Sequence, residues 1–211
     1  MNIILFGPQG CGKGTQAELI TKKLGLYSLS MGDELRSEIK RKTPLGKKIE
    51  HTVNTGGLVS PKITDDILIK ISKDKKAKKG LILDGFPRSI EQWAFLKKNF
   101  KLDAAIEIKL SEKESVKRIA SRRVCSKCGH TYNIITKKPK VSGKCDICNS
   151  KLIQREDDKP KRVKDRLKTY HLRTEPLKKK YQQLGILHVI NGEDSINNIH
   201  KNIMNALKIK K

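Results

Sequence analysis

A glycine-rich stretch close to the N-terminus has the clearest chemistry in this sequence. Residues 7–15 read GPQGCGKGT, which places Gly7, Gly12 and Lys13 in the G-x-x-x-x-G-K spacing of a phosphate-binding loop. Glycines let backbone N–H groups point at phosphate oxygens, and the N-terminus of a following helix adds partial positive charge. Lys13 supplies a full charge for the outer phosphates, and Thr15 can donate its hydroxyl to a phosphate or to the shell of a bound Mg²⁺. A glycine-rich turn without a ligand is the alternative, but it requires neither the lysine nor the apolar run before the loop.

A second chemically suggestive stretch is LILDGFPRS, residues 81–89, in which an apolar run ends at Asp84. A carboxylate at such a strand end faces the phosphate loop in folds of this kind and can hold Mg²⁺ through water. The alternative is an aspartate that simply opens a turn. Ligand sites in open α/β sheets lie outside the carboxyl ends of the strands, so the turn places Arg88 where it can bind an anion.

Four of the five cysteines form two C-x-x-C pairs, Cys125 with Cys128 and Cys145 with Cys148, separated by a short segment. This spacing is typical of four thiolates around Zn²⁺, and a site with four protein ligands has no open position, so we expect a structural zinc. A segment this short has almost no hydrophobic core, and the metal would supply much of its folding energy. Reduced free thiols or iron are the alternatives. His130 is either a spare ligand or a turn residue, and Cys11 is expected to be a small packing residue, with oxidation sensitivity as the alternative.

The elements that must position these residues follow from the apolar pattern. Residues 1–6 form an apolar run that suits a buried parallel strand. Further strands are predicted at residues 81–84, 104–110 and 187–191, and helices at residues 15–24, 61–72, 89–100, 112–121, 161–180 and 195–207. Strands that alternate with helices predict an α/β fold with a parallel sheet covered on both faces.

Two stretches interrupt this alternation. Residues 30–59 indicate short helices with a glycine pair and no obvious buried strand, and residues 122–158 contain the paired cysteines and the strand-like runs TYNII and KLIQR. Both are predicted to be insertions on the α/β core, which then comprises residues 1–29, 60–121 and 159–211.

Charge and composition restrict the function classes. The net charge is +25, with 47 Lys and Arg against 22 Asp and Glu, which raises the possibility of a nucleic-acid-binding protein. The lysines are spread along the whole chain and do not alternate with aromatic residues in one stripe, so we expect no specific nucleic-acid partner. The sequence has neither a long apolar run nor the features of a signal peptide, and we expect a cytoplasmic protein without a membrane partner.

Taken together, several motifs identify a family. The stretches GPQGCGKGTQ, SMGDELR, GGLVS, LILDGFPRSIEQ, RRV and REDD, and the four-cysteine insertion, occur in order from Met1 to about Gly192. In this order they resemble adenylate kinases of the long-lid bacterial form. The resemblance implies a P-loop NTPase core with a five-stranded parallel sheet flanked by helices, an NMP-binding insertion at 30–59 and a zinc-binding lid at 122–158. It also implies a monomeric transferase of nucleotide biosynthesis that catalyses ATP + AMP ⇌ 2 ADP with Mg²⁺ and so maintains the adenine nucleotide balance.

The resemblance also implies roles for individual residues. ATP would contact Gly10, Cys11, Gly12, Lys13, Gly14, Thr15, Arg118, Arg122, Thr131, Tyr132 and the backbone near Asp194. AMP would contact Met31, Arg36, Gly57, Leu58, Val59, Gly85, Phe86, Pro87, Arg88, Gln92, Arg155 and Arg166. The groups expected to act directly in catalysis are Lys13, Asp84, Arg88, Arg122, Arg155 and Arg166.

Three positions depart from the common pattern. Gly14 follows Lys13 where the simplest phosphate loop has Ser or Thr. Met31 stands where the family usually has Thr, which removes a hydroxyl from the expected AMP site, and Gln9 stands where Pro is common. A kinase for UMP, CMP or GMP is therefore the alternative within the same class, and a zinc-stabilised nucleic-acid-binding protein is the alternative outside it.

The number of arginines fits the expected chemistry. Phosphoryl transfer requires mainly positioning and stabilisation of charge, and the planar guanidinium group binds phosphate oxygens in pairs. Asp157 and Asp158 would hold lid arginines in place on closure, or else form a solvated pair at a helix start. Two mobile covers would keep water away from the transferred group.

Overall fold

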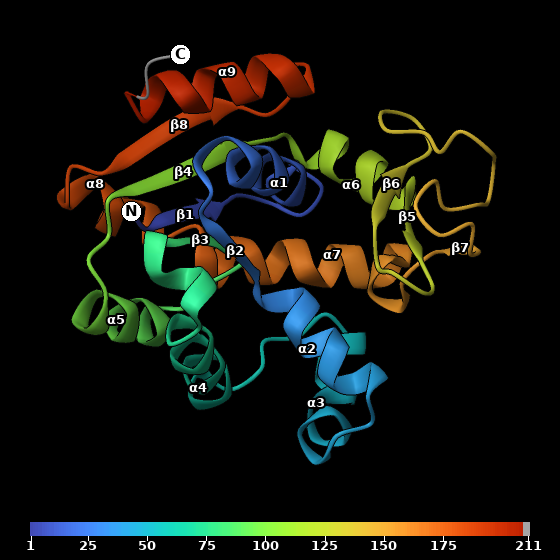
Figure 1. Cartoon of the computed structure of the whole chain (residues 1–211), viewed down its shortest axis with the longest axis horizontal. Coiled ribbons are helices and arrows are strands. Elements are labelled where there is room, and N and C mark those ends of the chain that lie inside the picture. The colour runs from blue at the N-terminus through green and yellow to red at the C-terminus, as the bar shows by residue number, and fades with distance from the viewer. Residues whose placement is uncertain (209–211) are drawn as a thin grey trace.

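The structure is a computed structural model that describes residues 1–208, so residues 209–211 of the expected core segment lie outside the described part (Figure 1). Its centre is a five-stranded sheet in the order β2-β3-β1-β4-β8, with every pair of neighbours parallel. The strands are β1 (Ile3–Phe6), β2 (Tyr27–Ser30), β3 (Leu81–Asp84), β4 (Ala104–Lys109) and β8 (Leu187–Asn191). The predicted α/β fold with a five-stranded parallel sheet is confirmed.

Residues of the central strands alternate between two apolar layers. In β1, Ile3 and Leu5 face one layer, while Ile4 and Phe6 face the other, as the two-residue period of a strand requires. All four residues of this strand are buried. Burial on both faces explains why β1, β3 and β4 are nearly continuous apolar runs that the sequence predicts as strands.

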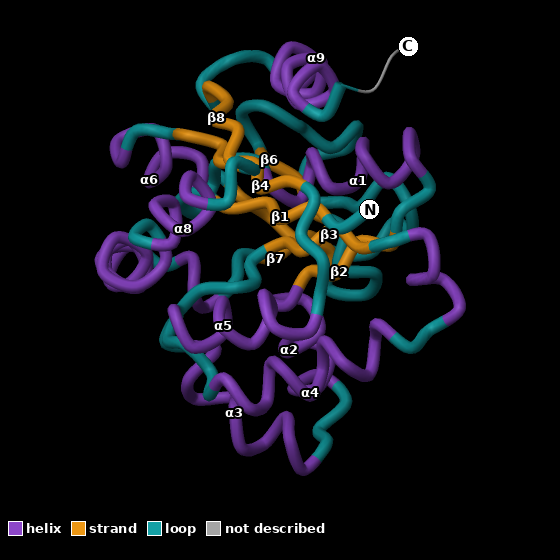
Figure 2. The backbone as a smooth tube through the Cα atoms, turned by 90° about the vertical axis from the view of Figure 1, so that its left-hand side faces the viewer, coloured by secondary structure: helices purple, strands orange, loops and turns teal. Residues whose placement is uncertain are grey.

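Helices cover both faces of the sheet (Figure 2). Helices α1 (Lys13–Leu24) and α9 (Ile196–Ala206) bury residues such as Ile20 and Ile203 against one face. Helices α4 (Pro61–Ser72), α5 (Ile90–Asn99) and α8 (Leu177–Gln183) pack residues such as Leu68, Leu96 and Tyr181 against the other face. A short 3₁₀ helix, Lys75–Lys79, leads into β3.

Within the parallel sheet and the helices around it, one strand and one helix differ from the sequence expectations. Strand β2 was not expected, because it lies at the sheet edge and buries only Leu29, so its sequence YSLS lacks an apolar run. The expected helix at 161–180 is interrupted: α7 (Pro160–Thr169) continues as a π-helical turn, Tyr170–Thr174, before α8 begins. Pro176 has no N–H for a continuous helical ladder, which accounts for the break.

Residues 31–54 form a helical pair that extends from the end of β2 (Figure 1). It consists of α2 (Met31–Lys40) and α3 (Pro44–Asn54), which pack on each other. Thr43 caps α3 by accepting a hydrogen bond from the Gly46 N–H at 2.9 Å, with Pro44 in the first turn. Ile49 and Val53 join the same apolar cluster as the sheet, so this pair is continuous with the main core.

A small antiparallel sheet contains the paired cysteines. Helix α6 (Glu112–Ala120) leads into β5 (Arg122–Cys125), which pairs with β6 (Thr131–Asn133) and β7 (Leu152–Ile153). The expected strand-like runs correspond to β6 and β7, whereas β5 was not expected. A 3₁₀ turn, Glu156–Asp158, connects this sheet to α7. Among residues 1–208, no helix is both long and apolar enough to cross a membrane.

Candidate active site

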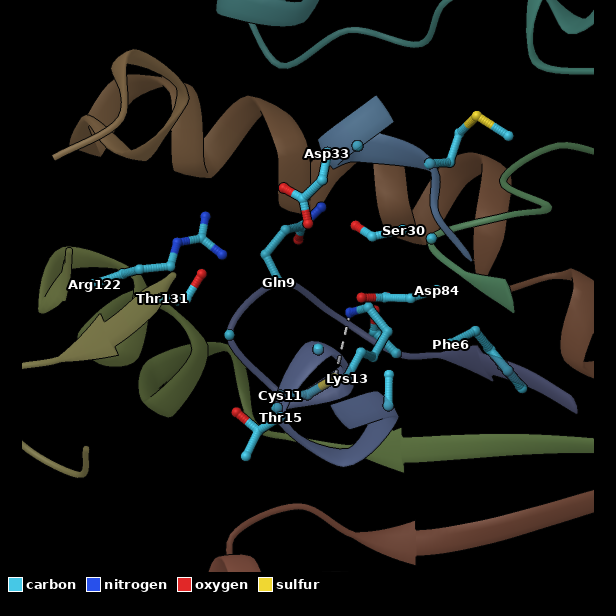
Figure 3. A pocket seen from close by; sticks show the side chains of 18 of the residues that line it. Phe6, Gln9, Cys11, Lys13, Thr15, Ser30, Asp33, Asp84, Arg122 and Thr131 are labelled. Carbon is cyan, nitrogen blue, oxygen red and sulfur yellow. Dashed lines mark hydrogen bonds between the residues drawn. The ribbon is translucent and has the colours of Figure 1, made fainter. Parts of the chain in front are cut away.

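A cavity of about 870 Å³ opens at the carboxyl ends of β1 and β3, between the α2–α3 pair and the cysteine-containing sheet (Figure 3). Every residue expected to bind ATP lines this cavity, and so does every residue expected to bind AMP except one. Phe86 is that exception: it is 1% exposed and packs in the main core. The two sets of residues, predicted separately, therefore surround one space.

The glycine loop presents its backbone to this cavity. Gly12 adopts a φ of 98° at the start of α1, and no side chain caps that helix. The first-turn N–H groups of a helix have no intrahelical partner, so here they are available to an anion. A Cβ atom on Gly7 would lie 2.4 Å from the carbonyl oxygen of Ile108, which explains why only glycine fits there. The loop thus has the form of an anion cradle.

Lys13 and Asp84 bring opposite charges to the loop. The Lys13 ammonium donates to the carbonyl oxygens of Gly7 and Pro8, both at 2.9 Å. Burial raises the pKa of Asp84, and the nearby Lys13 opposes that rise. Figure 3 shows both side chains reaching the same part of the cavity. A Cβ atom on Gly14 would lie 3.6 Å from Asp84 Oδ2, so the carboxylate sits directly beside the loop.

The turn after β3 is held by a chain of hydrogen bonds. The Gln92 Oε1 atom accepts from the backbone N–H of Arg88 at 2.7 Å, and its Nε2 donates to Thr64 Oγ1 at 2.9 Å. The Arg88 Nε donates to the Gly85 carbonyl at 2.8 Å, and no residue among 1–208 makes a hydrogen bond or ion pair with its terminal nitrogens, which line the cavity. Burial lowers the pKa of Arg88. The turn therefore presents a desolvated guanidinium group, which favours a bound anion.

Two aspartates hold arginines at the base of the cysteine-containing sheet. Arg122 donates through Nε to Asp158 at 2.8 Å and makes a second bond to the same carboxylate. Arg166 contacts Asp157 at 2.9 Å and Asp158 at 3.1 Å. Burial would lower the pKa of Arg122, but its bonds to Asp158 outweigh burial and raise it. For Arg166 burial prevails and lowers the pKa to about 10. Asp157 and Asp158 were expected either to hold lid arginines or to form a solvated pair at a helix start. The geometry agrees with the first alternative.

A third carboxylate, Asp33, links the two sides of the cavity. It accepts from Arg36 at 2.7 Å and from Arg155 at 3.3 Å. Burial alone would raise the pKa of Asp33, but the two guanidinium charges outweigh it and lower the pKa. Burial lowers the pKa of Arg155 to about 10, and the like charge of Arg36 adds to this. This concentration of positive charge suits phosphate groups.

Sequence reasoning missed two single residues of the site and one ion pair. Asp33 could have been found, because it precedes Arg36 by three residues on a predicted helix, where such pairs meet. Thr64, which holds Gln92, has no local signal. The pair of Lys137 with Glu18, at 3.5 Å between the cysteine-containing sheet and α1, depends on long-range folding and also has none.

The wall formed by β6 contains Thr131 and Tyr132. The Tyr132 hydroxyl accepts a hydrogen bond from the Asp146 N–H at 2.7 Å and lies 3.4 Å from Cys145 Sγ. Its polar end is therefore engaged with the cysteine cluster, while the residue still lines the cavity. Arg118 donates to Glu114 at 2.9 Å and to the Gly192 carbonyl at 2.8 Å, which places it between α6 and the loop that leads to Asp194.

On the opposite wall the cavity is apolar. Met31 is 3% exposed and shares an apolar cluster with Leu35, Val53 and Val59. Gly57 and Leu58 continue the same wall. A flat, largely apolar ring would fit this surface. Met31 contributes a thioether to it, at the position where the family pattern usually has the hydroxyl of a threonine.

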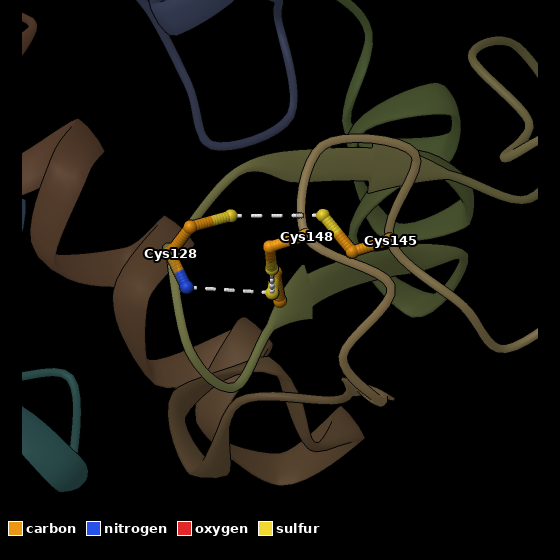
Figure 4. Close-up of side chains that lie close together, drawn as sticks. Cys128, Cys145 and Cys148 are labelled. Atoms are coloured by element: carbon orange, nitrogen blue, oxygen red, sulfur yellow. Dashed lines mark hydrogen bonds between the residues drawn. The ribbon is translucent and has the colours of Figure 1, made fainter.

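The four paired cysteines converge (Figure 4). Their sulfur atoms all lie within 4.8 Å of one another, with Cys125 and Cys148 at 3.3 Å and Cys128 and Cys145 at 3.6 Å. Four thiolates bound to one zinc at about 2.3 Å lie about 3.8 Å apart, so these residues fit a tetrahedral metal. His130 is not part of the cluster; its ring packs edge-on against Tyr132. Cys11 is fully buried, and burial raises the pKa of its thiol, as expected for a packing residue.

Comparisons with known proteins agree with this geometry. Residues 5–186 match the family described as adenylate kinase. The adenylate kinase of Clostridium botulinum (strain Langeland) is 45% identical over 216 residues, covering 98% of each chain. Those of Acetivibrio thermocellus, at 43% over 98% of each chain, and Pyrococcus abyssi, at 44% over 96% of this chain and 94% of its own, are similar to the same extent.

Proposed function

Because this chain belongs to the adenylate kinase family and is a phosphotransferase that converts ATP and AMP reversibly into two ADP, we propose that the transfer takes place in the single cavity described above. ATP binds with its phosphates on the glycine loop, and AMP binds on the Met31–Val59 wall. The observation that carries this proposal is that the residues assigned to each nucleotide meet around one space. The two phosphate chains then lie end to end between the loop and Arg88.

The chemical step needs no basic residue. An oxygen of the AMP phosphate forms a bond to the γ-phosphorus of ATP while the bond from that phosphorus to the bridging oxygen breaks, and ADP leaves with the electron pair. The nucleophile is already an anion, so the protein's work is positioning and charge stabilisation. Lys13 follows the outer phosphates, while Arg88, Arg122, Arg155 and Arg166 surround the transferred group.

Three carboxylates, the buried Asp157 and Asp158 and the exposed Asp33, orient the arginines of the cavity. Asp33, Asp157 and Asp158 hold arginines in place, and an arriving phosphate competes for guanidinium groups whose pKa burial has lowered. Binding polyanions here offsets the repulsion among the arginines. When bound with ATP, Mg²⁺ supplies further neutralisation of phosphate charge, and Asp84 with Thr15 would hold it. Segments 30–59 and 122–158 act as covers that exclude water during transfer.

Zinc at the four cysteines is proposed as structural. All four positions of a tetrahedral ion would be filled by thiolates, so no site for a water or substrate remains. Free thiolates require a reducing environment, which supports a cytoplasmic location. Since one chain provides every residue around the cavity, a monomer is sufficient for activity, and light scattering of the purified protein tests that state.

The proposal is tested by measuring ADP formed from ATP, Mg²⁺ and AMP. Lys13→Ala is expected to lower kcat/KM by about 100-fold or more, since it removes a charge aimed at the phosphates. Lys47→Ala, an exposed lysine on α3, is the matched control and should stay within about twofold. No ADP from the wild-type protein, or a normal rate for Lys13→Ala, would contradict the proposal.

Specificity for the base is tested in the same assay with UMP, CMP and GMP in place of AMP. The apolar wall at Met31 supports adenine, whereas both polar ends of the Gln92 amide are engaged by Arg88 and Thr64. A rate with another monophosphate that exceeds the rate with AMP would contradict that assignment.

A further inference from the structure

A lysine outside the cavity joins the two covers directly. Lys40, the last residue of α2, donates to the carbonyl oxygens of Ser126 at 3.0 Å and Lys127 at 2.9 Å. These two residues lie between Cys125 and Cys128, inside the first C-x-x-C turn. The contact spans more than 80 residues of sequence. Lys40 is not among the residues that line the cavity.

The turn has a reason to present carbonyl groups outward. Its N–H groups face inward: the Cys128 N–H points to Cys125 Sγ at 3.4 Å, and the Ser126 N–H donates to the Lys151 carbonyl at 3.0 Å. With the N–H ends engaged on the inner side, the carbonyl oxygens of Ser126 and Lys127 are directed to the opposite side. An ammonium group with three donors on a long stem can reach both at once.

The acceptor pair exists only while the turn keeps this shape. Four sulfur atoms that converge on one point fix the turn when a metal links them. Without that link the segment has only a small buried cluster, made of two cysteines, Tyr132 and Leu152, to hold it. The position of the two carbonyls therefore depends on the cysteine cluster.

We propose that Lys40 is a positioning residue that latches the AMP-side cover onto the cysteine turn, so that the folded metal site stabilises the closed arrangement of both covers. The inference rests on the proposed function of segments 30–59 and 122–158 as covers. It goes beyond that function because it gives the metal site a part in AMP binding through one side chain.

A second bridge between the covers behaves differently. Arg155 and Asp33 also connect the two sides, at 3.3 Å, but both line the cavity and compete with bound phosphates. Lys40 does not line the cavity, so bound phosphates do not compete with Ser126 and Lys127 for its ammonium group. It therefore affects the closed state without changing the contacts to substrate.

The test uses the full-length, metal-loaded protein and three variants. Lys40→Met keeps the length of the side chain and removes its donors, Lys40→Arg keeps donors, and Lys47→Met is the control for lost charge on the same cover. Lys40→Met removes the hydrogen bonds of a charged donor. We expect this loss to raise the KM for AMP about three- to tenfold and to leave kcat within about twofold of the wild type. Lys40→Arg should restore KM to within about twofold of the wild type, and Lys47→Met should leave it unchanged.

Hydrogen exchange gives a readout independent of activity. In the presence of a bisubstrate dinucleoside pentaphosphate, the segments around residues 36–43 and 122–130 should exchange faster in Lys40→Met than in the wild type. In a Cys125→Ser, Cys128→Ser background, Lys40→Met should not further speed the exchange of residues 36–43, because its acceptors are already lost.

Three outcomes would contradict the proposed role of Lys40. An unchanged KM and exchange pattern in Lys40→Met, or an equal effect of Lys47→Met, or full additivity with the cysteine changes, would overturn the latch. A wild-type protein without transfer would instead overturn the proposed function, so the two failures are distinguishable.

Discussion

The parallel sheet and the cysteine-containing sheet are stabilised in different ways. In the parallel sheet, residues such as Ile3, Ile82 and Ile106 are fully buried between two layers of helices. In segment 122–158, the buried cluster has four members, and two of them are cysteines. Several large aliphatic side chains there are exposed, including Val141 and Ile147 at 56% and 65%. The parallel sheet is held by apolar burial, whereas the smaller segment buries little apolar surface, and we propose that a metal at its four cysteines stabilises it.

The helical pair α2–α3 lies between these extremes. Ile49 and Val53 belong to the same apolar cluster as Leu83 of the sheet, so this cover is an extension of the core. The difference suits the proposed covers. Segment 122–158 has its own small cluster at the cysteines, so it can move as a unit without exposing the main core. The α2–α3 pair shares its apolar cluster with the sheet, so it can move only by sliding over that shared surface.

The largest expected effect comes from removing the metal ligands. Cys125→Ser together with Cys128→Ser should abolish metal binding and unfold segment 122–158, because structural zinc contributes about 10–16 kcal/mol to the folding of small domains. The parallel sheet should keep its protection from hydrogen exchange, since its core shares no residue with the cysteine cluster. Metal content by mass spectrometry and exchange mapped by segment are the measurements.

The control for that prediction is Cys11→Ala, which alters a buried cysteine of the core and should keep one metal per chain. If the double variant kept its metal, or if its parallel sheet unfolded together with the smaller segment, the contrast between the two regions would be wrong.

The same contrast explains what the sequence could predict. Buried strands and the phosphate loop depend on local patterns, apolar runs and fixed glycine spacing, and they appear where expected. The cysteine cluster follows from C-x-x-C spacing alone. Strand β2 was missed because an edge strand with one buried residue, Leu29, has little apolar signal.

The remaining site residues depend on contacts that no local pattern encodes. The bond from Gln92 to Thr64 joins positions 28 residues apart, and the one from Arg122 to Asp158 joins positions 36 apart. The family pattern named the arginines, and Asp157 and Asp158 were expected to hold lid arginines, but which arginine each carboxylate holds required the fold. Asp33 was within reach of the sequence, because its helical pair with Arg36 is local.

A smaller effect is expected where the two regions join. Asp158 has a fully buried carboxylate between Arg122, at the start of β5, and Arg166 in α7. Asp158→Asn leaves Arg122 without its paired carboxylate and Arg166 with Asp157 alone, and breaking a buried pair costs about 3–5 kcal/mol. Urea unfolding at pH 7 measures the loss. The bonds to Arg122 lower the pKa of Asp158 against the effect of burial, so its contribution is complete above about pH 4 and is lost as the pH falls through the lowered pKa.

The matched control is Asp165→Asn, which changes an exposed carboxylate 4.0 Å from Arg162 on the same helix. Exposed pairs contribute little, so this variant should lose less than about 0.5 kcal/mol. Equal losses for the two aspartates would mean that the buried pairs of Asp158 stabilise the protein no more than an exposed ion pair does. The junction between the two regions would then not depend on Asp158.

The smallest expected effect concerns the π-helical turn Tyr170–Thr174, beside this junction. His171, in the π-helical turn after α7, lies 2.9 Å from Glu112 of α6 through Nε2 and 2.7 Å from Glu175 through Nδ1. Only the protonated ring can donate to both carboxylates, because the neutral ring has one donor. The bond to Glu175 raises the pKa of His171 above its ordinary value of 6.5.

His171→Gln therefore tests a pH-dependent connection between α6, which leads into segment 122–158, and the π-helical turn that follows α7. Since the folded pKa is raised, the stabilisation is fully present below about pH 6.5 and is lost as the pH rises through the raised value. The side chains are partly exposed, which limits the effect to about 0.2–1 kcal/mol. Urea unfolding should show that loss at pH 5.5 and none at pH 9. An equal loss at both pH values would mean that His171 contributes by packing, and the junction would then rest on the buried aspartates alone.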